Sequence, residues 1–266
     1  MNKAILWIGL SLFLVSNAVA GGKACKRRFE VGVASYPPFF SRNASNQPEG
    51  FTYELIEGMQ NRLGICFIIK ELSRPALMEN LATHRIDAVM LVAQNAAFEK
   101  SANFIQLWNV SREIVVAKSI YSKDKKIQSY IDDKKVIFGN IIGTRTSLTS
   151  DEEKDLFKNQ RLLEAVDIKS TFDLLSKGRV QAVLLSPLLN NYYLNMLPNK
   201  NDFVRVGDPD DKHRVDAGIY TSKIRVKDED RESILKAIEE IRKDGTLAKI
   251  IKKYYGEDAT EANLQL

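Results

Sequence analysis

The sequence predicts an α/β fold of two similar lobes that face each other across a ligand cleft. The main observation lies in residues 73–92, where a helix begins at Ser73 and is followed by a β-branched apolar run typical of a buried strand. The same pattern recurs downstream, since RIDAVML at residues 85–91 matches RVQAVLL at residues 179–185. Ligands of open parallel sheets bind beyond the carboxyl ends of the strands, so each unit is expected to bring a loop to the cleft.

Residues 1–20 have the features of a cleaved secretory signal peptide. Lys3 supplies a positive start, residues 5–15 are apolar, and residues 18–20 (AVA) suit a signal peptidase. The apolar run is too short for a membrane span, which favours export to the periplasm over a retained anchor. Cleavage leaves 246 residues (266 minus 20), a length that suits one two-lobed unit.

Cys25 and Cys66 are the two cysteines, and export places them in an oxidising compartment. Each precedes a predicted strand, and a disulfide is sensible if those two strands are parallel neighbours. In the chain-entropy treatment, closing a loop of this length stabilises the fold by about 4 kcal/mol. Two free buried thiols are the alternative.

The other predicted elements follow from apolar periodicity and from turn residues. Pro37 and Pro38 lie in an aromatic turn that cannot continue a sheet, and its aromatic rings could stack on a ligand or pack in a core. Gly64 ends an amphipathic helix, and the chain after residue 256 is polar and is expected to be unpaired. The predicted strands are 29–34, 67–70 and 136–138, and the predicted helices are 50–63, 230–243 and 247–255. Residues 93–101 are predicted to form a loop, after which residues 104–108 lead back into the fold, and a second loop at 139–146 is predicted to enter a helix.

The composition argues against several classes of function. The formal net charge of +5 is modest and the charges are well mixed, so no nucleic-acid partner is expected. His84 and His213 have no acidic or cysteine neighbour at metal-ligand spacing, and we expect no metal and no cofactor. Ser186-Pro187 lacks the flanking glycines of a nucleophile elbow, so no catalytic residue is predicted.

Several motifs, taken together and in order, resemble the bacterial extracellular solute-binding proteins of family 3, the amino-acid-type receptors of ABC importers. The resemblance implies a two-lobed periplasmic-binding-protein fold of type II, with two hinge strands and a ligand cleft between the lobes. It implies lobe 1 at residues 21–117 and 217–266, and lobe 2 at residues 118–216. The implied partners are a small-molecule ligand and either an ABC-transporter permease or a membrane sensor. The implied assembly is a monomer. The motifs are YPPF (36–39), GFTYEL (50–55), RIDA (85–88), GT (143–144), GRVQAV (178–183), DGTL (244–247) and IIKKYYG (250–256).

The chain departs from this family at the residues that hold an amino acid. The family's Thr and Arg after the first-lobe strand, which clamp the α-carboxylate, fall on Asn95 and Phe98. The family's Asp after the second-lobe strand, which holds the α-ammonium, falls on Ser186. Lys100 and Arg112 are nearby cations, but neither is in register. We therefore expect ordinary α-amino acids to bind poorly.

Two cations lie where the resemblance predicts cleft-facing positions. Arg74 is at the start of a helix, and Arg145 follows Gly143-Thr144 at a helix entry, where backbone N–H groups favour anions. The alternatives are that Arg74 lies along the surface and that Arg145 pairs with Asp151 or Glu152. With these cations facing the cleft, the ligand is expected to be a small polar anion. The predicted ligand-binding residues are Tyr36, Arg74, Gln94, Thr144, Arg145 and Ser186.

Three functions are compatible with these features. The leading prediction is a non-enzymatic periplasmic receptor that closes over its ligand and serves an ABC importer or a sensor. The second is an enzyme similar to cyclohexadienyl dehydratases, which use cleft carboxylates on this fold; no carboxylate pair is evident in the predicted cleft loops. The third is a sensory module with a degenerate pocket, in keeping with the missing amino-acid clamp.

Overall fold

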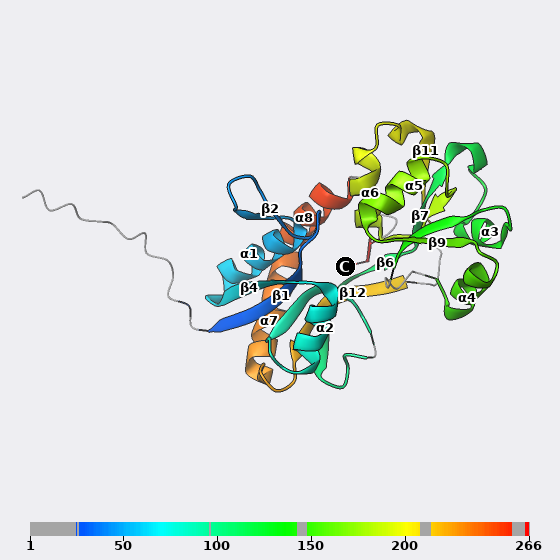
Figure 1. The fold of residues 1–266 in the computed structure, drawn as a ribbon. Helices are drawn as coiled ribbons and strands as arrows, with labels where there is room; N and C mark the ends of the chain where they lie inside the picture. The colour runs from blue at the N-terminus through cyan, green and yellow to red at the C-terminus, as the bar shows by residue number, and fades with distance from the viewer. Residues whose placement is uncertain are drawn as a thin grey trace, which may run out of the picture.

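The computed structural model describes residues 25, 27–95, 97–142, 148–207, 214–256 and 264–265. Its helices and strands form two α/β lobes that lie side by side (Figure 1). The expected signal peptide at residues 1–20 lies outside the described residues. Within the described ranges, no helix is both long enough and apolar enough to cross a bilayer.

Lobe 1 is built on a six-stranded sheet with the order β13-β6-β12-β5-β1-β4. The central strand β1 is parallel to β4 and β5, and β12 runs antiparallel to both β5 and β6. A short hairpin of β2 (Ser41–Arg42) and β3 (Pro48–Glu49) follows β1. The sheet strands are β1 (Arg28–Ala34), β4 (Cys66–Leu72), β5 (Ala88–Ala93), β6 (Ala102–Ser111), β12 (Arg214–Ser222) and β13 (Leu264–Gln265).

Helices cover both faces of this sheet. The larger core lies under α1 (Phe51–Leu63), α7 (Asp228–Lys243) and α8 (Thr246–Tyr255), as predicted for the two C-terminal helices. A smaller apolar cluster lies under α2 (Arg74–Ala82) on the other face. Gly64 adopts φ 61°, the left-handed conformation that ends α1 and that glycine adopts without steric cost.

Lobe 2 is built on a five-stranded sheet with the order β11-β7-β10-β8-β9. One apolar cluster contains buried residues of α3 and α4, and a second contains buried residues of α5 and α6. The strands are β7 (Glu113–Ala117), β8 (Phe138–Ile141), β9 (Leu162–Ala165), β10 (Ala182–Val183) and β11 (Phe203–Gly207), and the helices are α3 (Ile127–Asp132), α4 (Ser150–Lys158), α5 (Ile168–Ser176) and α6 (Pro187–Met196), with 3-10 turns η1 (Lys118–Ile120) and η2 (Lys200–Asp202).

The two sheets repeat one arrangement, which confirms the prediction of two similar lobes. In lobe 1, β4, β1 and β5 are parallel and β12 is antiparallel to β5; in lobe 2, β9, β8 and β10 are parallel and β7 is antiparallel to β10. The similar segments 85–91 and 179–185 therefore supply β5 and β10, which occupy equivalent places. The second strand is much shorter than its sequence pattern suggests, because only Ala182 and Val183 join the ladder.

The predicted strand at residues 136–138 was wrong in extent. The ladder begins at Phe138, which pairs with Ala182 on one side and Leu162 on the other, and it continues to Ile141. Val136 is excluded because its N–H donates to the Asp133 carbonyl in a turn, 3.0 Å away. The start of the segment predicted as a loop therefore lies inside the sheet.

The chain terminus also differs from its prediction. The segment after residue 256 was expected to be unpaired, yet Leu264 pairs with Val110 and Gln265 with Asn109. β6 is otherwise the edge strand of this sheet, and an edge strand presents unpaired backbone groups that another strand can satisfy.

The chain passes between the sheets twice. β6 ends at Ser111 in the large sheet and β7 begins at Glu113 in the small one; the return falls between β11 and β12. We propose to divide the lobes by sheet membership, which puts the first crossing at Arg112. The sequence-based boundaries after residues 117 and 216 would instead assign β7 to lobe 1 and divide β12.

Helix α6 of lobe 2 contacts lobe 1 directly. Leu188 is fully buried in the lobe 1 core, and the Asn191 side chain donates to the Tyr254 carbonyl at 3.2 Å. The Tyr193 hydroxyl donates to the Pro37 carbonyl, also at 3.2 Å. The lobes are therefore joined by the packing of α6 as well as by the crossing strands.

The predicted disulfide is present, and the free-thiol alternative does not hold in the structure. Cys25 and Cys66 are bonded, with their Cα atoms 5.7 Å apart. The parallel register of β1 and β4 pairs Arg28 with Cys66 and so brings the two cysteines together. This is the neighbouring-strand geometry on which the prediction depended.

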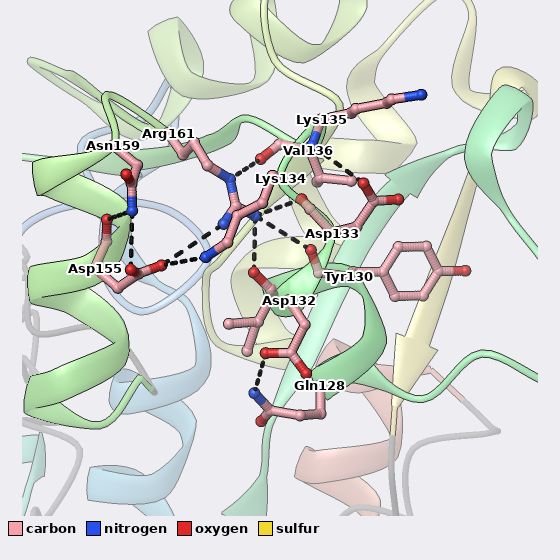
Figure 2. Close-up of polar contacts among 11 residues, drawn as sticks. Gln128, Tyr130, Asp132, Asp133, Lys134, Lys135, Val136, Asp155, Asn159 and Arg161 are labelled. Carbon is pink, nitrogen blue, oxygen red and sulfur yellow. Dashed lines mark hydrogen bonds and ion pairs between the residues drawn. The ribbon is translucent and has the colours of Figure 1, made fainter.

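A buried arginine ties α3 to the lobe 2 sheet (Figure 2). The Arg161 side chain donates through Nε to the Val136 carbonyl at 3.0 Å, and through Nη2 to the carbonyls of Ile131 and Asp133 at 2.8 and 2.7 Å. The last carbonyls of a helix have no intrahelical donor, and a cation there also complements the helix dipole. Arg161 therefore serves the fold of lobe 2.

Candidate ligand-binding site

A pocket of about 250 Å³ lies in lobe 1 at the carboxyl ends of the parallel strands β1 and β4. Its location agrees with the rule that open α/β sheets bind ligands beyond these strand ends. The pocket contains two of the predicted binding residues, Tyr36 and Arg74. It is lined by Ala34, Ser35, Tyr36, Glu71, Leu72, Ser73 and Arg74.

Arg74 is the positive charge of this pocket. It is the first residue of α2, which Ser73 caps by accepting a hydrogen bond from the Ala76 N–H. The Arg74 side chain is exposed, and no ion pair joins it to another residue in the part of the chain that the structure describes. An exposed guanidinium with no protein carboxylate bound to it can offer its paired donors to an anionic group.

Glu71 is the negative charge of the same pocket and was not anticipated from the sequence. Arg42 in β2 approaches one oxygen, Oε1, with Nε at 2.6 Å and Nη2 at 2.5 Å. The other oxygen, Oε2, accepts a long hydrogen bond of 3.4 Å from the Ser35 hydroxyl. The pocket is therefore not purely cationic.

Tyr36 forms one wall of the pocket beside Arg74. Its ring lies edge-on to Phe39, with the centroids 5.3 Å apart, and it packs against the lobe 2 core under α6. Burial raises the pKa of the Tyr36 hydroxyl, and the positive charge of Arg74 partly opposes that shift. Tyr36 is therefore a neutral, half-buried ring committed in part to contact between the lobes.

Gln94 lies just beyond the end of β5, as predicted. Its backbone N–H donates to the Asp216 carbonyl at 2.8 Å, and its exposed side chain donates to Glu99 at 3.1 Å. It is not among the residues that line the pocket beside Arg74.

Ser186 lies at the amino end of α6, in lobe 2. Its Oγ is shielded from solvent and has no hydrogen-bond partner among the described residues. A buried hydroxyl without a partner costs free energy, and a ligand group could satisfy it. Thr144 and Arg145, the other predicted lobe 2 contacts, lie outside the described residues.

The two first-lobe positions that match the family's carboxylate clamp are engaged in contacts within lobe 1. Phe98 is buried against Tyr220, with ring centroids 5.1 Å apart, and the Asn95 backbone N–H donates to the Tyr220 hydroxyl at 2.8 Å. Arg112 is buried and pairs with Glu152 at 3.2 Å. None of these side chains lines the pocket.

Glu71, Ser35 and Arg42 were not predicted from the sequence as residues of the site. Glu71 could have been predicted, because it directly follows the predicted strand at residues 67–70. If that strand is parallel to residues 29–34, both strands end at the same edge of the sheet. In the structure, Val33 pairs with Glu71 and Ala34 with Leu72, so residues after both strands share the pocket. Arg42 could not be placed in this way, since it reaches Glu71 from a separate hairpin.

Two α/β lobes joined by crossing strands, with a small polar pocket at the strand ends, define a class of two-lobed ligand-binding proteins. The chain belongs to the bacterial extracellular solute-binding proteins, family 3, which it matches over residues 29–257. This agrees with the resemblance seen in its motifs.

Similar proteins include receptors with different ligands. The chain is 26% identical over 263 residues to the histidine-binding periplasmic protein of Escherichia coli K12, covering 97% of this chain and 98% of the relative. It is 26% identical over 231 residues to the L-cystine-binding protein TcyA of Bacillus subtilis, covering 85% and 80%. An ancestral arginine-binding protein bound to arginine has the same fold, with a TM-score of 0.65 and 24% identity over 86% of this chain and 98% of that one.

Proposed function

We propose that this protein is a periplasmic receptor that captures a small polar ligand bearing an anionic group, such as a carboxylate, and serves an ABC importer. We base this proposal on the placement of Arg74. Its exposed guanidinium, at the start of α2, lines a small pocket beside Tyr36. A guanidinium binds a carboxylate with two parallel hydrogen bonds, and such charge-assisted bonds are stronger than neutral ones.

Binding would be completed by lobe 2. Ser186 offers a hydroxyl without a partner among the described residues at the amino end of α6, and Thr144 and Arg145 are proposed to bind the ligand from the same lobe. Contacts made by both lobes only in the closed state would supply the free energy of closure. Gln94 is proposed as a neutral hydrogen-bonding residue at the end of β5.

The proposed location and partners follow the relatives. Those named above include a periplasmic protein, and residues 1–20 carry the features of a cleaved export signal. The closed receptor would present its lobes to the permease of an ABC importer.

We propose binding rather than catalysis. Among the described residues, the pocket offers one carboxylate, Glu71, and that group is already paired with Arg42. A dehydratase of this fold would need groups that can exchange protons with the substrate, and a single ion-paired carboxylate does not provide an acid and a base.

The test is a ligand screen followed by charge removal. The mature protein would be screened by thermal shift against small carboxylates and the standard amino acids, and checked by native mass spectrometry for a co-purified molecule. Arg74→Ala should weaken binding of the best ligand about ten- to a hundredfold, because one charge-assisted contact is lost. Added salt should also weaken binding.

Arg85→Ala is the matched control. It removes the same charge just after α2, where Arg85 pairs with Glu79 in solvent, away from the pocket. Wild-type affinity in Arg74→Ala, or equal losses in both variants, would contradict the proposed role of Arg74. Turnover of a bound molecule would contradict the assignment as a receptor.

A further inference from the structure

Glu71 gives the pocket a negative charge close to Arg74. The two residues lie at either end of a short link, Glu71 near the end of β4 and Arg74 at the start of α2, and both line the same pocket of about 250 Å³. A ligand that fills this space next to Arg74 would therefore also lie next to a carboxylate. An ionised group that accepts hydrogen bonds repels an anion and attracts a cation.

Arg42 holds this carboxylate in one orientation and leaves part of it open. Two of its donors, Nε at 2.6 Å and Nη2 at 2.5 Å, reach the same oxygen, Oε1. Oε2 receives only the long 3.4 Å contact from the Ser35 hydroxyl. A carboxylate has about four acceptor sites on its two oxygens, so Oε2 retains capacity for a further donor.

The exposure of this ion pair argues for a positioning role. The Arg42 and Glu71 side chains are 41% and 30% exposed, and ion pairs so open to solvent contribute little to stability. Their geometry nevertheless fixes the direction of the Glu71 carboxylate. A binding group whose orientation is already fixed loses less conformational entropy when the ligand arrives.

We infer that Glu71, positioned by Arg42, is a specificity-determining residue that recognises a cationic group of the ligand. The inference rests on the proposed function, in which Arg74 binds the anionic group. Lobe 1 would then select a ligand with both charges, and would discriminate against a simple anion of the same size.

Matched pairs of ligands test this directly. The probes are propionate against alanine and β-alanine, and butyrate against 4-aminobutyrate, titrated at millimolar concentrations into the mature protein by thermal shift. In at least one pair the aminated member should bind wild type about ten- to a hundredfold more tightly. Glu71→Gln should abolish this preference while leaving the affinity for the unaminated member unchanged or improved.

Two variants complete the design. Glu49→Gln removes one negative charge from the neighbouring hairpin, outside the pocket, and should keep the wild-type preference. Arg42→Ala should reduce the preference, because Glu71 loses its fixed orientation. The melting temperatures of the ligand-free variants report whether the fold is intact.

The outcomes separate this inference from the proposed function. Equal or tighter binding of every unaminated member, no binding of any probe, or a preference that survives Glu71→Gln would each overturn the role of Glu71. If unaminated carboxylates bind and Arg74→Ala abolishes that binding, the proposed function stands while this inference fails. If Arg74→Ala has no effect on any probe, both fail together.

Discussion

The Tyr193 hydroxyl donates a hydrogen bond to the Pro37 carbonyl oxygen, 3.2 Å away, and this bond joins the two lobes. Tyr193 is in α6 of lobe 2, and Pro37 is in the turn after β1 of lobe 1, next to the pocket residue Tyr36. The Tyr193 ring also stacks on Phe172, with centroids 5.8 Å apart. The turn that forms one wall of the pocket is therefore held by lobe 2.

Tyr193→Phe should shift the protein toward a more open arrangement of its lobes. The substitution keeps the ring and removes one neutral hydrogen bond, which contributes about 0.5–1.5 kcal/mol, so the open fraction should rise about two- to tenfold. Small-angle X-ray scattering of the ligand-free protein would detect this as a larger radius of gyration. Tyr192→Phe is the control, because no described hydrogen bond involves the Tyr192 hydroxyl; an equal change in both variants would refute the role of the bond.

The Tyr193 bond should be insensitive to pH across the neutral range. Burial raises the pKa of Tyr193 to about 12, above the ordinary value of 10.0. The folded state therefore favours the neutral hydroxyl, and this contribution to stability is fully present below about pH 10 and is lost as the pH rises toward 12. Denaturation of wild type and Tyr193→Phe should show a constant difference from pH 6 to about pH 9 that shrinks at higher pH.

Breaking the Cys25–Cys66 bond should lower the stability of lobe 1. The cysteines are 41 residues apart, and the chain-entropy treatment gives a loss of about 4 kcal/mol when such a loop opens. Urea denaturation with and without a reductant would measure the loss. The double variant Cys25→Ser/Cys66→Ser should match the reduced protein and should not respond to the reductant. Two reactive thiols in exported, non-reduced protein would contradict the pairing.

Arg161→Ala should destabilise lobe 2 strongly. Several buried carbonyl oxygens at the end of α3 would lose their donor, and each such loss costs about 1–3 kcal/mol. The chemical-denaturation midpoint should fall well below that of wild type. Lys134→Ala is the control in the same cluster (Figure 2): it breaks an exposed pair with Asp155 and should change the midpoint little. Similar midpoints for the two variants would show that the Arg161 contacts contribute little.

Arg205→Ala should lower the free energy of unfolding strongly near neutral pH and less strongly at acidic pH. Glu113 is 2% exposed, and Arg205 reaches its two oxygens at 3.0 and 2.8 Å, so removing the guanidinium leaves a buried charge and costs about 3–5 kcal/mol. Burial already raises the pKa of Glu113, and its neutral form would become the stable one in the variant.

The sign of this pH dependence follows from linkage. A carboxyl whose folded pKa exceeds its unfolded value stabilises the fold at low pH and loses that contribution as pH rises through the folded pKa. The deficit of Arg205→Ala should therefore shrink as the pH is lowered from neutral into the acid range. Adding Glu113→Gln should remove most of that pH dependence, and a deficit that stays constant with pH in Arg205→Ala would contradict the account.

The fold class and much of the local structure could be predicted from signals between residues that are close along the chain. The periodic apolar positions, the cap at Ser73 and the stop at Gly64 predicted helices α1 and α2, because these signals act between residues close along the chain. The repeat of RIDAVML as RVQAVLL predicted two lobes, and both copies lie at equivalent places in their sheets. The disulfide could also be predicted from the sequence, because it depends only on the two strands that follow the cysteines being neighbours.

The pairing of the charges depends on contacts between elements that are distant along the chain. Arg74 was predicted from its place at a helix start, and the structure places it beside a pocket. The partner of Glu71, in contrast, comes from a separate hairpin, and the partner of Arg112 comes from helix α4. The burial of Phe98 against Tyr220 joins residues that are far apart in the chain. Contacts of this kind depend on which elements pack together in three dimensions, and periodicity and capping signals carry no information about that packing.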